Sequence, residues 1–269
     1  GMFMFGEAFD YDAAKIAEHT WPANANVSVL DFPSRGAMEE TFGLKQKGYE
    51  TLAEPLHLLG GPYANPYELM SFYDNHDMPR LDATDNGFID ANNWLFTARG
   101  IPVLYYGSET GFMRGRAEHA GNRAYFGQQR VDAAPQSPIF GPLQRVARLR
   151  EATPALQRGL QVNERLQGNT AVFYRVLQQG EVSQTALVLL NKGDAAQTFE
   201  VKRYLQAGLW RDALDGGTQQ VGSRLKVQVP AHGIKVFVLD APVQQPALQA
   251  ELDRAMADQH ARTRRLASP

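Results

Sequence analysis

The stretch ELMSFYDNHDMPR, residues 68–80, sets polar and titratable side chains directly after a short apolar run. Residues 68–73 predict a buried strand, and the polar run 74–77 begins where such a strand should end. The carboxyl ends of parallel strands are where α/β folds carry their functional groups, so this run is the first candidate site. The alternative is a solvated turn whose side chains bond only to local backbone and which Pro79 closes.

Three other apolar runs also end in acidic or polar residues, and helix-like segments separate the runs. This alternation predicts a parallel sheet or barrel in which the polar strand ends share one rim. The first run is apolar throughout and therefore predicts a strand that is buried on both faces. The predicted strands are residues 2–5, 27–30, 68–73 and 101–107. The predicted helical segments are residues 10–19, 37–42, 49–59, 88–99 and 143–149.

The second half of the chain has a different pattern, with short strands separated by Gly, Asn, Asp and Pro, and it predicts an antiparallel β-sandwich. Beyond it, residues 247–266 predict a helix with a frayed end, which we expect to be a packing arm that is solvated rather than functional. We therefore expect three parts: residues 1–155, residues 156–240 and a helical or disordered tail at residues 241–269. The predicted sandwich strands are residues 170–177, 185–190, 198–201, 208–212, 225–229 and 234–239.

The composition narrows the classes of function. The 269 residues include 27 basic and 29 acidic residues with a net charge of −2, which favours a neutral or weakly charged ligand over nucleic acid. The chain has no cysteine, which excludes disulfides, thiolate metal sites and cysteine nucleophiles. No apolar stretch reaches the roughly 18 residues of a membrane span, and the start lacks the basic region of a signal peptide. We expect a soluble protein, with no membrane partner and an unknown localisation.

Glu7, Asp31 and Asp77 are three acids at the ends of three predicted strands of one sheet. Two carboxylates that face a sugar can carry out glycoside hydrolysis, so this set suggests that chemistry. Glu7 follows four apolar residues and a glycine, and we expect it to be partly buried, which would favour the protonated form that a general acid needs. A solvated strand end is the alternative for Glu7.

Four segments resemble those of the α-amylase family, in the same order. Residues 5–9, FGEAF, are similar to the segment with the acid/base glutamate at the end of the fifth barrel strand. Residues 29–33, 72–77 and 100–109 resemble the segments of the sixth, seventh and eighth strands. The resemblance implies an α/β fold in which strands five to eight, the second half of a (β/α)8 TIM barrel, are followed by the family's antiparallel β-sandwich domain.

The resemblance also implies roles for individual residues. Glu7 would be the general acid/base, Asp77 would stabilise the transition state, and His76 would bind sugar hydroxyls. Asp74 and Asn75 would shape the turn. The candidate substrate-binding residues are His76, Asp74, Asn75, Arg80, which would line the cleft, and Asp31, which has no catalytic role. No metal ligand is identified, although the family makes a calcium ion conceivable, and no other cofactor is expected.

The family's nucleophile is an aspartate after the fourth strand, with an arginine two residues before it, and no residue here matches either. We therefore expect a carboxy-terminal portion of an enzyme that acts on α-glucans or maltooligosaccharides, by hydrolysis or by transfer, and that is inactive alone. Half a barrel would also leave an open sheet edge. A second copy of the chain could cover that edge, which would give a homodimer.

Other interpretations remain. The chain could be a non-catalytic glycan-binding or self-associating protein on a degenerate barrel, although such a protein has no need of an acid at position 7. Half of an α/β-hydrolase is disfavoured because residues 107–111 lack the central serine of a nucleophile elbow. Residues 82–87 lack the ligand spacing of a calcium loop. Arg123, near Tyr125, either lines the rim or lies in a solvated loop.

Overall fold

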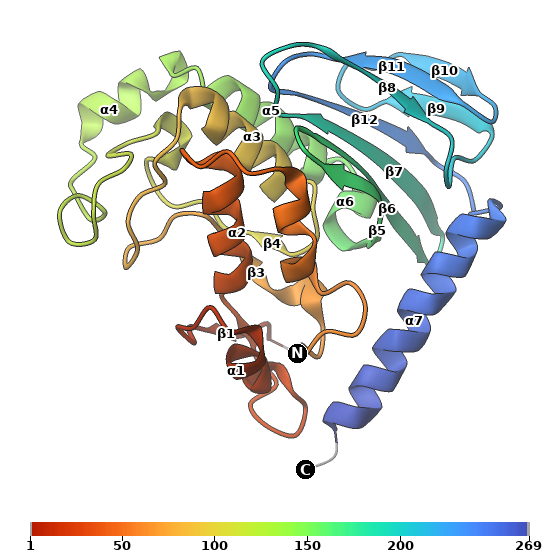
Figure 1. The fold of residues 1–269 in the computed structure, drawn as a ribbon, viewed down its shortest axis with the longest axis horizontal. Helices are drawn as coiled ribbons and strands as arrows, with labels where there is room; N and C mark the ends of the chain where they lie inside the picture. Colours follow the sequence, from red (N-terminus) through yellow and green to blue (C-terminus); the bar gives the residue numbers. More distant parts are fainter. Residues whose placement is uncertain (1, 268–269) are drawn as a thin grey trace.

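The computed structural model describes residues 2–267 and has a mixed α/β fold with a parallel and an antiparallel part (Figure 1). The parallel part contains β1 (Phe5–Gly6), β2 (Ser28–Val29), β3 (Met70–Ser71) and β4 (Ile101–Pro102). β1 pairs with β2, and β3 pairs with β4. A parallel bridge from Leu30 to Met70 connects the two pairs, so the strands follow one another in the order β1-β2-β3-β4. Within residues 2–267 they form no closed barrel.

The first apolar run is not buried. Met2, Phe3, Met4 and Phe5 are 83%, 52%, 52% and 57% exposed. The prediction of a strand buried on both faces is therefore wrong. The physical reason is that β1 has a pairing partner, β2, along one edge only, and within the described residues no second layer covers these side chains.

Helices cover the parallel strands, and several begin at a side-chain cap. Asp31 caps the start of α2 (Phe32–Phe42), where its carboxylate accepts a hydrogen bond from the backbone of Ser34. Thr84 caps α3 (Asp85–Leu95), where its hydroxyl accepts one from the backbone of Gly87. The other helices of this part are α1 (Ala13–Ala17), α4 (Gln128–Ala133), α5 (Phe140–Glu151) and α6 (Pro154–Arg158). The helical segment predicted at residues 49–59 consists of two 3₁₀ turns, Tyr49–Leu52 and Glu54–Leu56, because Pro55 cannot continue an α-helix. Further 3₁₀ turns are Glu18–Thr20, Pro66–Glu68, Ser108–Thr110 and Ala134–Gln136.

The second half forms one six-stranded antiparallel sheet with the order β10-β9-β12-β7-β6-β5, and a separate β11-β8 pair. The six predicted strands are present, and β5 and β10 were missed because their sequences are mostly polar and, in β5, irregular near Asn163. Apolar side chains of the two sheets pack together in one cluster, for example Leu189 with Phe199. The strands are β5 (Leu160–Gln167), β6 (Thr170–Gln179), β7 (Val182–Asn191), β8 (Gln197–Val201), β9 (Gly208–Asp212), β10 (Thr218–Val221), β11 (Leu225–Val229) and β12 (Gly233–Leu239).

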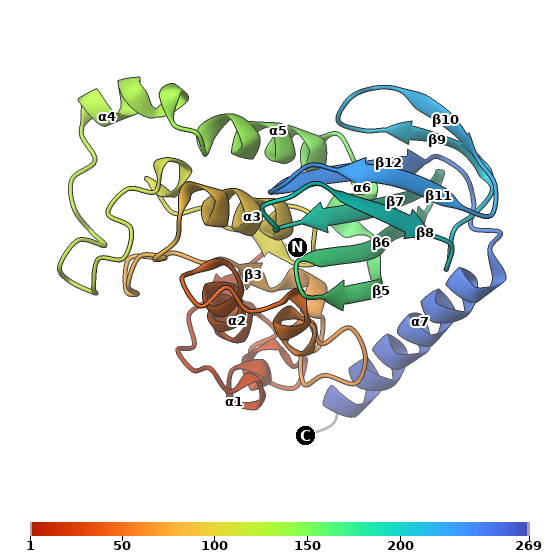
Figure 2. The same ribbon diagram turned by 45° about the horizontal axis from the view of Figure 1, so that its top comes forward.

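The largest hydrophobic cluster joins the two halves of the chain. Trp94 of α3 and Val146 of α5 pack with Phe173 of β6 and Val188 of β7. The rings of Trp94 and Phe173 meet edge to face, with centroids 5.6 Å apart. Figure 2 shows α3 and α5 lying along the six-stranded sheet. One face of that sheet is therefore buried by the helices of the first half.

The last helix, α7 (Pro246–Leu266), crosses from the antiparallel sheet back toward the first half (Figures 1 and 2). Leu248 and Leu252 are buried against the sheet cluster. Arg262 is also buried and donates to the backbone oxygen of Tyr63 over 3.2 Å. The helix is a packing arm as expected, but the expectation that it is solvated fails for its inner face. No helix among residues 2–267 has the length and hydrophobicity that a membrane span requires.

We predict that Phe173→Ala lowers the free energy of unfolding by about 3–5 kcal/mol, because it opens a cavity where the two halves pack. Urea denaturation of the variant and the unmodified chain measures this loss. Tyr125→Ala is the control, since that ring is 87% exposed and its loss should change the stability little. An equal effect of both substitutions would contradict a shared core.

Candidate functional site

The parallel register brings the carboxyl ends of the four short strands to one edge. Gly6 pairs with Val29, Leu30 bridges to Met70, and Met70 pairs with Ile101. Glu7 and the polar run 74–77 both follow strands of this sheet, so they leave it at the same edge. We call this edge the rim.

Glu7 is exposed at the rim, and its carboxylate makes no hydrogen bond or ion pair within the described residues. The expectation that it is partly buried is therefore wrong. The apolar residues before it are themselves exposed, so they exclude no water from its carboxylate. A free carboxylate at a strand end is accessible to a ligand, but nothing in residues 2–267 desolvates it.

His76 and Asp77 lie side by side in the loop after β3. The distance from His76 Nε2 to Asp77 Oδ2 is 3.0 Å, and the two side chains are 51% and 35% exposed. Arg123 forms an ion pair with the other carboxylate oxygen of Asp77 and donates from Nε to the backbone oxygen of His76 over 2.9 Å. The rim thus presents an imidazole, a carboxylate and a guanidinium in one contiguous group.

Asn122, which the sequence analysis missed, holds this group in place. Its buried amide donates to the backbone oxygens of His76 over 2.6 Å and of Met78 over 3.2 Å. Its own backbone oxygen accepts from Arg80 Nη2 over 3.2 Å and from the Tyr105 hydroxyl over 3.0 Å. Asn122 comes from a long irregular loop, where no periodic pattern identifies a contact with residues that lie more than forty positions earlier.

Asp74 and Asn75 shape the turn, as the resemblance implies. Asp74 is buried, and its two carboxylate oxygens accept from Leu81 N over 2.6 Å and from Ser108 Oγ over 2.7 Å. Burial raises the pKa of Asp74, and these hydrogen bonds oppose that rise. Asn75 accepts from the backbone of Asp77 over 2.9 Å. Both residues are buried, so neither presents an exposed group to a substrate, although both were expected to bind one.

Arg80 is also buried rather than lining an open cleft. It donates to the backbone oxygen of Tyr106 over 2.8 Å, and its guanidinium lies 4.4 Å from the Tyr105 ring centroid and 4.9 Å from that of Tyr106. Its role in the structure is to hold these two aromatic rings next to the loop of His76. The Tyr106 ring stays partly exposed, as do the rings of Phe9 and Tyr125.

Asp31 is inaccessible to a ligand, although it also follows a strand. It is fully buried, caps α2, and forms an ion pair of 2.6 Å with Arg99, whose side chain is equally buried. A helix begins directly after β2, so this strand-end acid serves the helix and the buried arginine instead of the rim. Its expected place among the substrate-binding residues is not what the structure shows.

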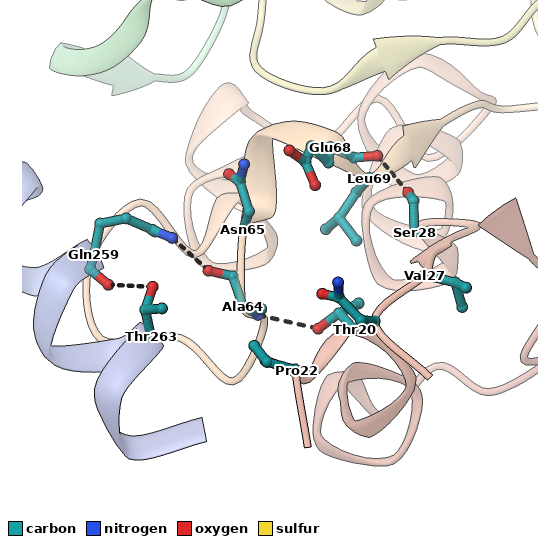
Figure 3. Close-up of a pocket in the computed structure, with 11 residues that line it drawn as sticks. Thr20, Pro22, Val27, Ser28, Ala64, Asn65, Glu68, Leu69, Gln259 and Thr263 are labelled. Atoms are coloured by element: carbon teal, nitrogen blue, oxygen red, sulfur yellow. Dashed lines mark hydrogen bonds between the residues drawn. The ribbon is translucent and has the colours of Figure 1, made fainter. Parts of the chain in front are cut away.

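Within residues 2–267, neither a metal-ligand cluster nor the cavity drawn in Figure 3 lies at this group. Among the described residues, no set of three or more His, Cys, Asp or Glu side chains is arranged to hold a metal ion such as the calcium that the resemblance suggests. A cavity of about 180 Å³ lies instead near the amino ends of β2 and β3, between Ser28, Glu68 and the α7 residues Gln259 and Thr263 (Figure 3). It is therefore at the opposite ends of the strands from the rim.

Comparison with known proteins identifies relatives along most of the chain. No protein-family model matches it. An α-amylase from Streptomyces lividans is 26% identical over 290 residues, which cover 91% of this chain and 31% of the relative. A cyclomaltodextrin glucanotransferase from Paenibacillus macerans is 28% identical and covers 92% of this chain and 35% of the relative. The chain thus spans about a third of the length of these relatives.

Solved structures agree with these relatives. An α-amylase from Geobacillus thermoleovorans, complexed with acarbose, superposes with a TM-score of 0.75 and 23% identity, over 89% of this chain and 53% of that one. The cyclomaltodextrin glucanotransferase CldA superposes with a TM-score of 0.70 and 28% identity, over 89% of this chain and 50% of that one. The first likeness shows the fold alone, and both cover about half of the larger protein.

We predict that Asn122→Ala loosens the loop of His76, because the buried backbone oxygen of Met78 loses this donor and that of His76 keeps only Arg123, at a cost of about 1–3 kcal/mol. Hydrogen exchange of residues 74–80 should become at least about fivefold faster, since 1 kcal/mol corresponds to that factor in an opening equilibrium. Gln128→Ala, which removes an amide from the exposed start of α4, is the matched control. Unchanged exchange in Asn122→Ala would show that this amide does not hold the loop.

Proposed function

We propose that this chain, which is related to the α-amylase family and corresponds to a carboxy-terminal portion of such enzymes, contributes to an enzyme that acts on α-glucosidic bonds. The observation that carries the proposal is the rim, where Glu7 follows β1 and the pair His76 and Asp77 follows β3 of one parallel sheet. The reaction is retaining hydrolysis or transglycosylation, because the relatives include both α-amylases and glucanotransferases.

The parallel strands support a finer assignment. β1 to β4 would be strands five to eight of a (β/α)8 barrel within residues 1–155, followed by a β-sandwich domain at residues 156–240 and a helical tail at residues 241–269. The order β1-β2-β3-β4, with a helix or helical turns after each of β1, β2 and β3, is the arrangement that half of such a barrel would have.

The rim residues fit distinct roles in glycoside chemistry. Glu7 is accessible and would deliver a proton to the glycosidic oxygen and later accept one. Asp77 would stabilise the positive charge that develops on the sugar ring, and His76 would bind a sugar hydroxyl. The ion pair with Arg123 orients the Asp77 carboxylate. Exposed rings of Phe9, Tyr106 and Tyr125 provide apolar faces of the kind that pack against sugar rings.

The substrate would be an α-glucan or a maltooligosaccharide, and the isolated chain would not turn it over. A retaining mechanism needs a second carboxylate as nucleophile, and no residue of this chain matches the family's nucleophile. Closing a barrel around Glu7 would also supply the desolvation that the exposed carboxylate lacks. The activity therefore requires a second polypeptide part that packs beside β1 and β4.

A non-catalytic glycan-binding protein is the alternative, and the exposed aromatic rings without a nucleophile are the observation that favours it. The two candidates share the rim but differ in what Glu7 does. In a binding protein Glu7 contributes at most a hydrogen bond, whereas in the enzyme it transfers a proton.

For maltooligosaccharide binding we expect calorimetry to detect an interaction that Asp77→Asn weakens about tenfold, a loss of about 1.4 kcal/mol. Glu7→Gln should keep the affinity but abolish any residual cleavage of a chromogenic maltooligosaccharide, and Glu18→Gln, at an exposed helical turn, should change neither. A loss of affinity in Glu7→Gln favours the binding protein, because there this carboxylate contributes a hydrogen bond to the sugar, whereas in the enzyme it transfers a proton. Turnover by the isolated chain at normal family rates would refute its incompleteness.

The unpaired edge of β1 should make the isolated chain self-associate. We expect light scattering at high concentration to give the mass of a dimer, because Met4 and Phe5 expose apolar surface next to the unpaired edge of β1. Met4→Lys should return the mass to that of a monomer, while Leu209→Lys, at an exposed position of β9, should not. A strictly monomeric mass for the unmodified chain would count against the dimer.

A further inference from the structure

His232 lies between two acids where the two halves of the chain meet. It belongs to the turn between β11 and β12, with a φ of 49°. Its Nδ1 is 2.7 Å from Asp90 Oδ2, and its Nε2 is 3.0 Å from Asp194 Oδ1. Asp90 is on α3, and Asp194 follows β7. One imidazole therefore connects a helix of the first half with two turns of the antiparallel sheet.

We propose that the cluster of Asp90, His232 and Asp194 is a proton-dependent latch, which fastens the turn of His232 to α3 when protonated and loosens when the proton leaves. The bond to Asp90 is the part that crosses between the halves. The bond to Asp194 stays within the second half and keeps the imidazole ring oriented. The latch is independent of the rim, because none of its residues lies there.

The charges around the cluster show why a proton matters. The Asp90 side chain is 5% exposed and that of Asp194 is 100% exposed, so only the first carboxylate is deprived of water. When the imidazole is neutral and both carboxylates are ionised, the cluster carries two negative charges. Lys192, whose Nζ lies 3.4 Å from the backbone oxygen of Gln46, is a second cation near Asp90, and Glu50 lies near Lys192. Protonation of the imidazole supplies the remaining counter-charge.

The pKa shifts of both partners point the same way. Burial raises the pKa of Asp90 to about 7, and its bond to His232 opposes that rise. Burial by itself would lower the pKa of His232, but the hydrogen bonds to Asp90 and Asp194 outweigh it and raise that pKa above its ordinary value. Whichever partner holds the proton, the folded cluster binds it more tightly than the unfolded chain does.

The direction of the pH effect follows from linkage. A raised folded-state pKa contributes stability that is fully present below the unfolded pKa and is lost as the pH rises through the folded one. For Asp90 this range runs from its ordinary value near 4 to about 7, and for His232 it begins at about 6.5 and extends upward. The latch therefore tightens below neutral pH and loosens as the solution becomes mildly alkaline.

Water can reach the cluster, so its protonation can follow the pH of the solution. A cavity of about 230 Å³ is lined by Asp90, His232 and Asp194 together with Lys192 and Asn86. The proton that leaves the imidazole can pass through this opening to bulk water without the halves separating first.

Hydrogen exchange at several pH values, corrected for intrinsic rates, tests the latch in the intact chain. Protection of residues 228–236 and 85–95 should fall about tenfold between pH 6 and pH 8. If the folded state holds one more proton than the open state over one pH unit, the opening equilibrium changes tenfold. His232→Asn should show a clearly smaller change over that range than the unmodified chain, because asparagine tolerates a positive φ and does not titrate, so that only Asp90 of the pair still responds to pH. His19→Asn, at an exposed helical turn, should behave like the unmodified chain.

Asp194→Asn provides a second variant that should fold, since this side chain is fully exposed. NMR titration of the His232 ring should show a lower pKa in this variant than in the unmodified chain, because one of the two carboxylates that raise it has lost its charge. The proposal is overturned if protection does not depend on pH, if His232→Asn keeps the full dependence, or if the ring of the unmodified chain titrates at its ordinary value.

Discussion

The buried ion pair between Asp31 and Arg99 is the interaction on which the arrangement of the first half depends. Besides Asp31, the Arg99 side chain donates to the backbone oxygens of Pro55 and Leu56, and its backbone N–H donates to the Gln161 side chain over 2.8 Å. The pair therefore joins the end of β2, the segment that leads toward β3, and the edge strand β5 of the antiparallel sheet. Removing either charge would leave the other buried without a counter-charge, which is far more costly than losing a surface ion pair.

Buried donors such as Arg99 explain why acidic residues at neighbouring strand ends have different roles. Asp31 forms a buried ion pair with Arg99, and Asp74 accepts hydrogen bonds from Leu81 and Ser108. Glu7 and Asp77 have no buried donor of this kind, so they stay accessible to a ligand. Burial and the nearest donor, rather than position at a strand end, separate the structural carboxylates from the candidate functional ones.

One side of the parallel strands has no covering layer of helices or strands within the described residues. Two-residue strands bury little surface themselves, and Val29 of β2 packs with Ile16 and Ala17 of α1 in a small cluster apart from the core shared with β6 and β7. The outer face of β1 has no such support within the described residues, and its methionine and phenylalanine side chains are exposed. The longer relatives contain further polypeptide, since this chain covers only 31% and 53% of two of them, and this agrees with the exposed face of β1. Both support the proposal that a further polypeptide part completes the site.

The sequence by itself determined the order of elements and the family resemblance, because short apolar runs followed by polar residues are local patterns. It identified α3, α5, most antiparallel strands and the exposed pair of His76 and Asp77. Only the tertiary structure decided that residues 2–5 are exposed, that Asp31 and Arg80 are buried, and that Asn122 holds the rim. The reason is physical: burial and hydrogen-bond partners depend on which distant segments meet, and a strand-end acid looks the same in sequence whether it faces water or an arginine.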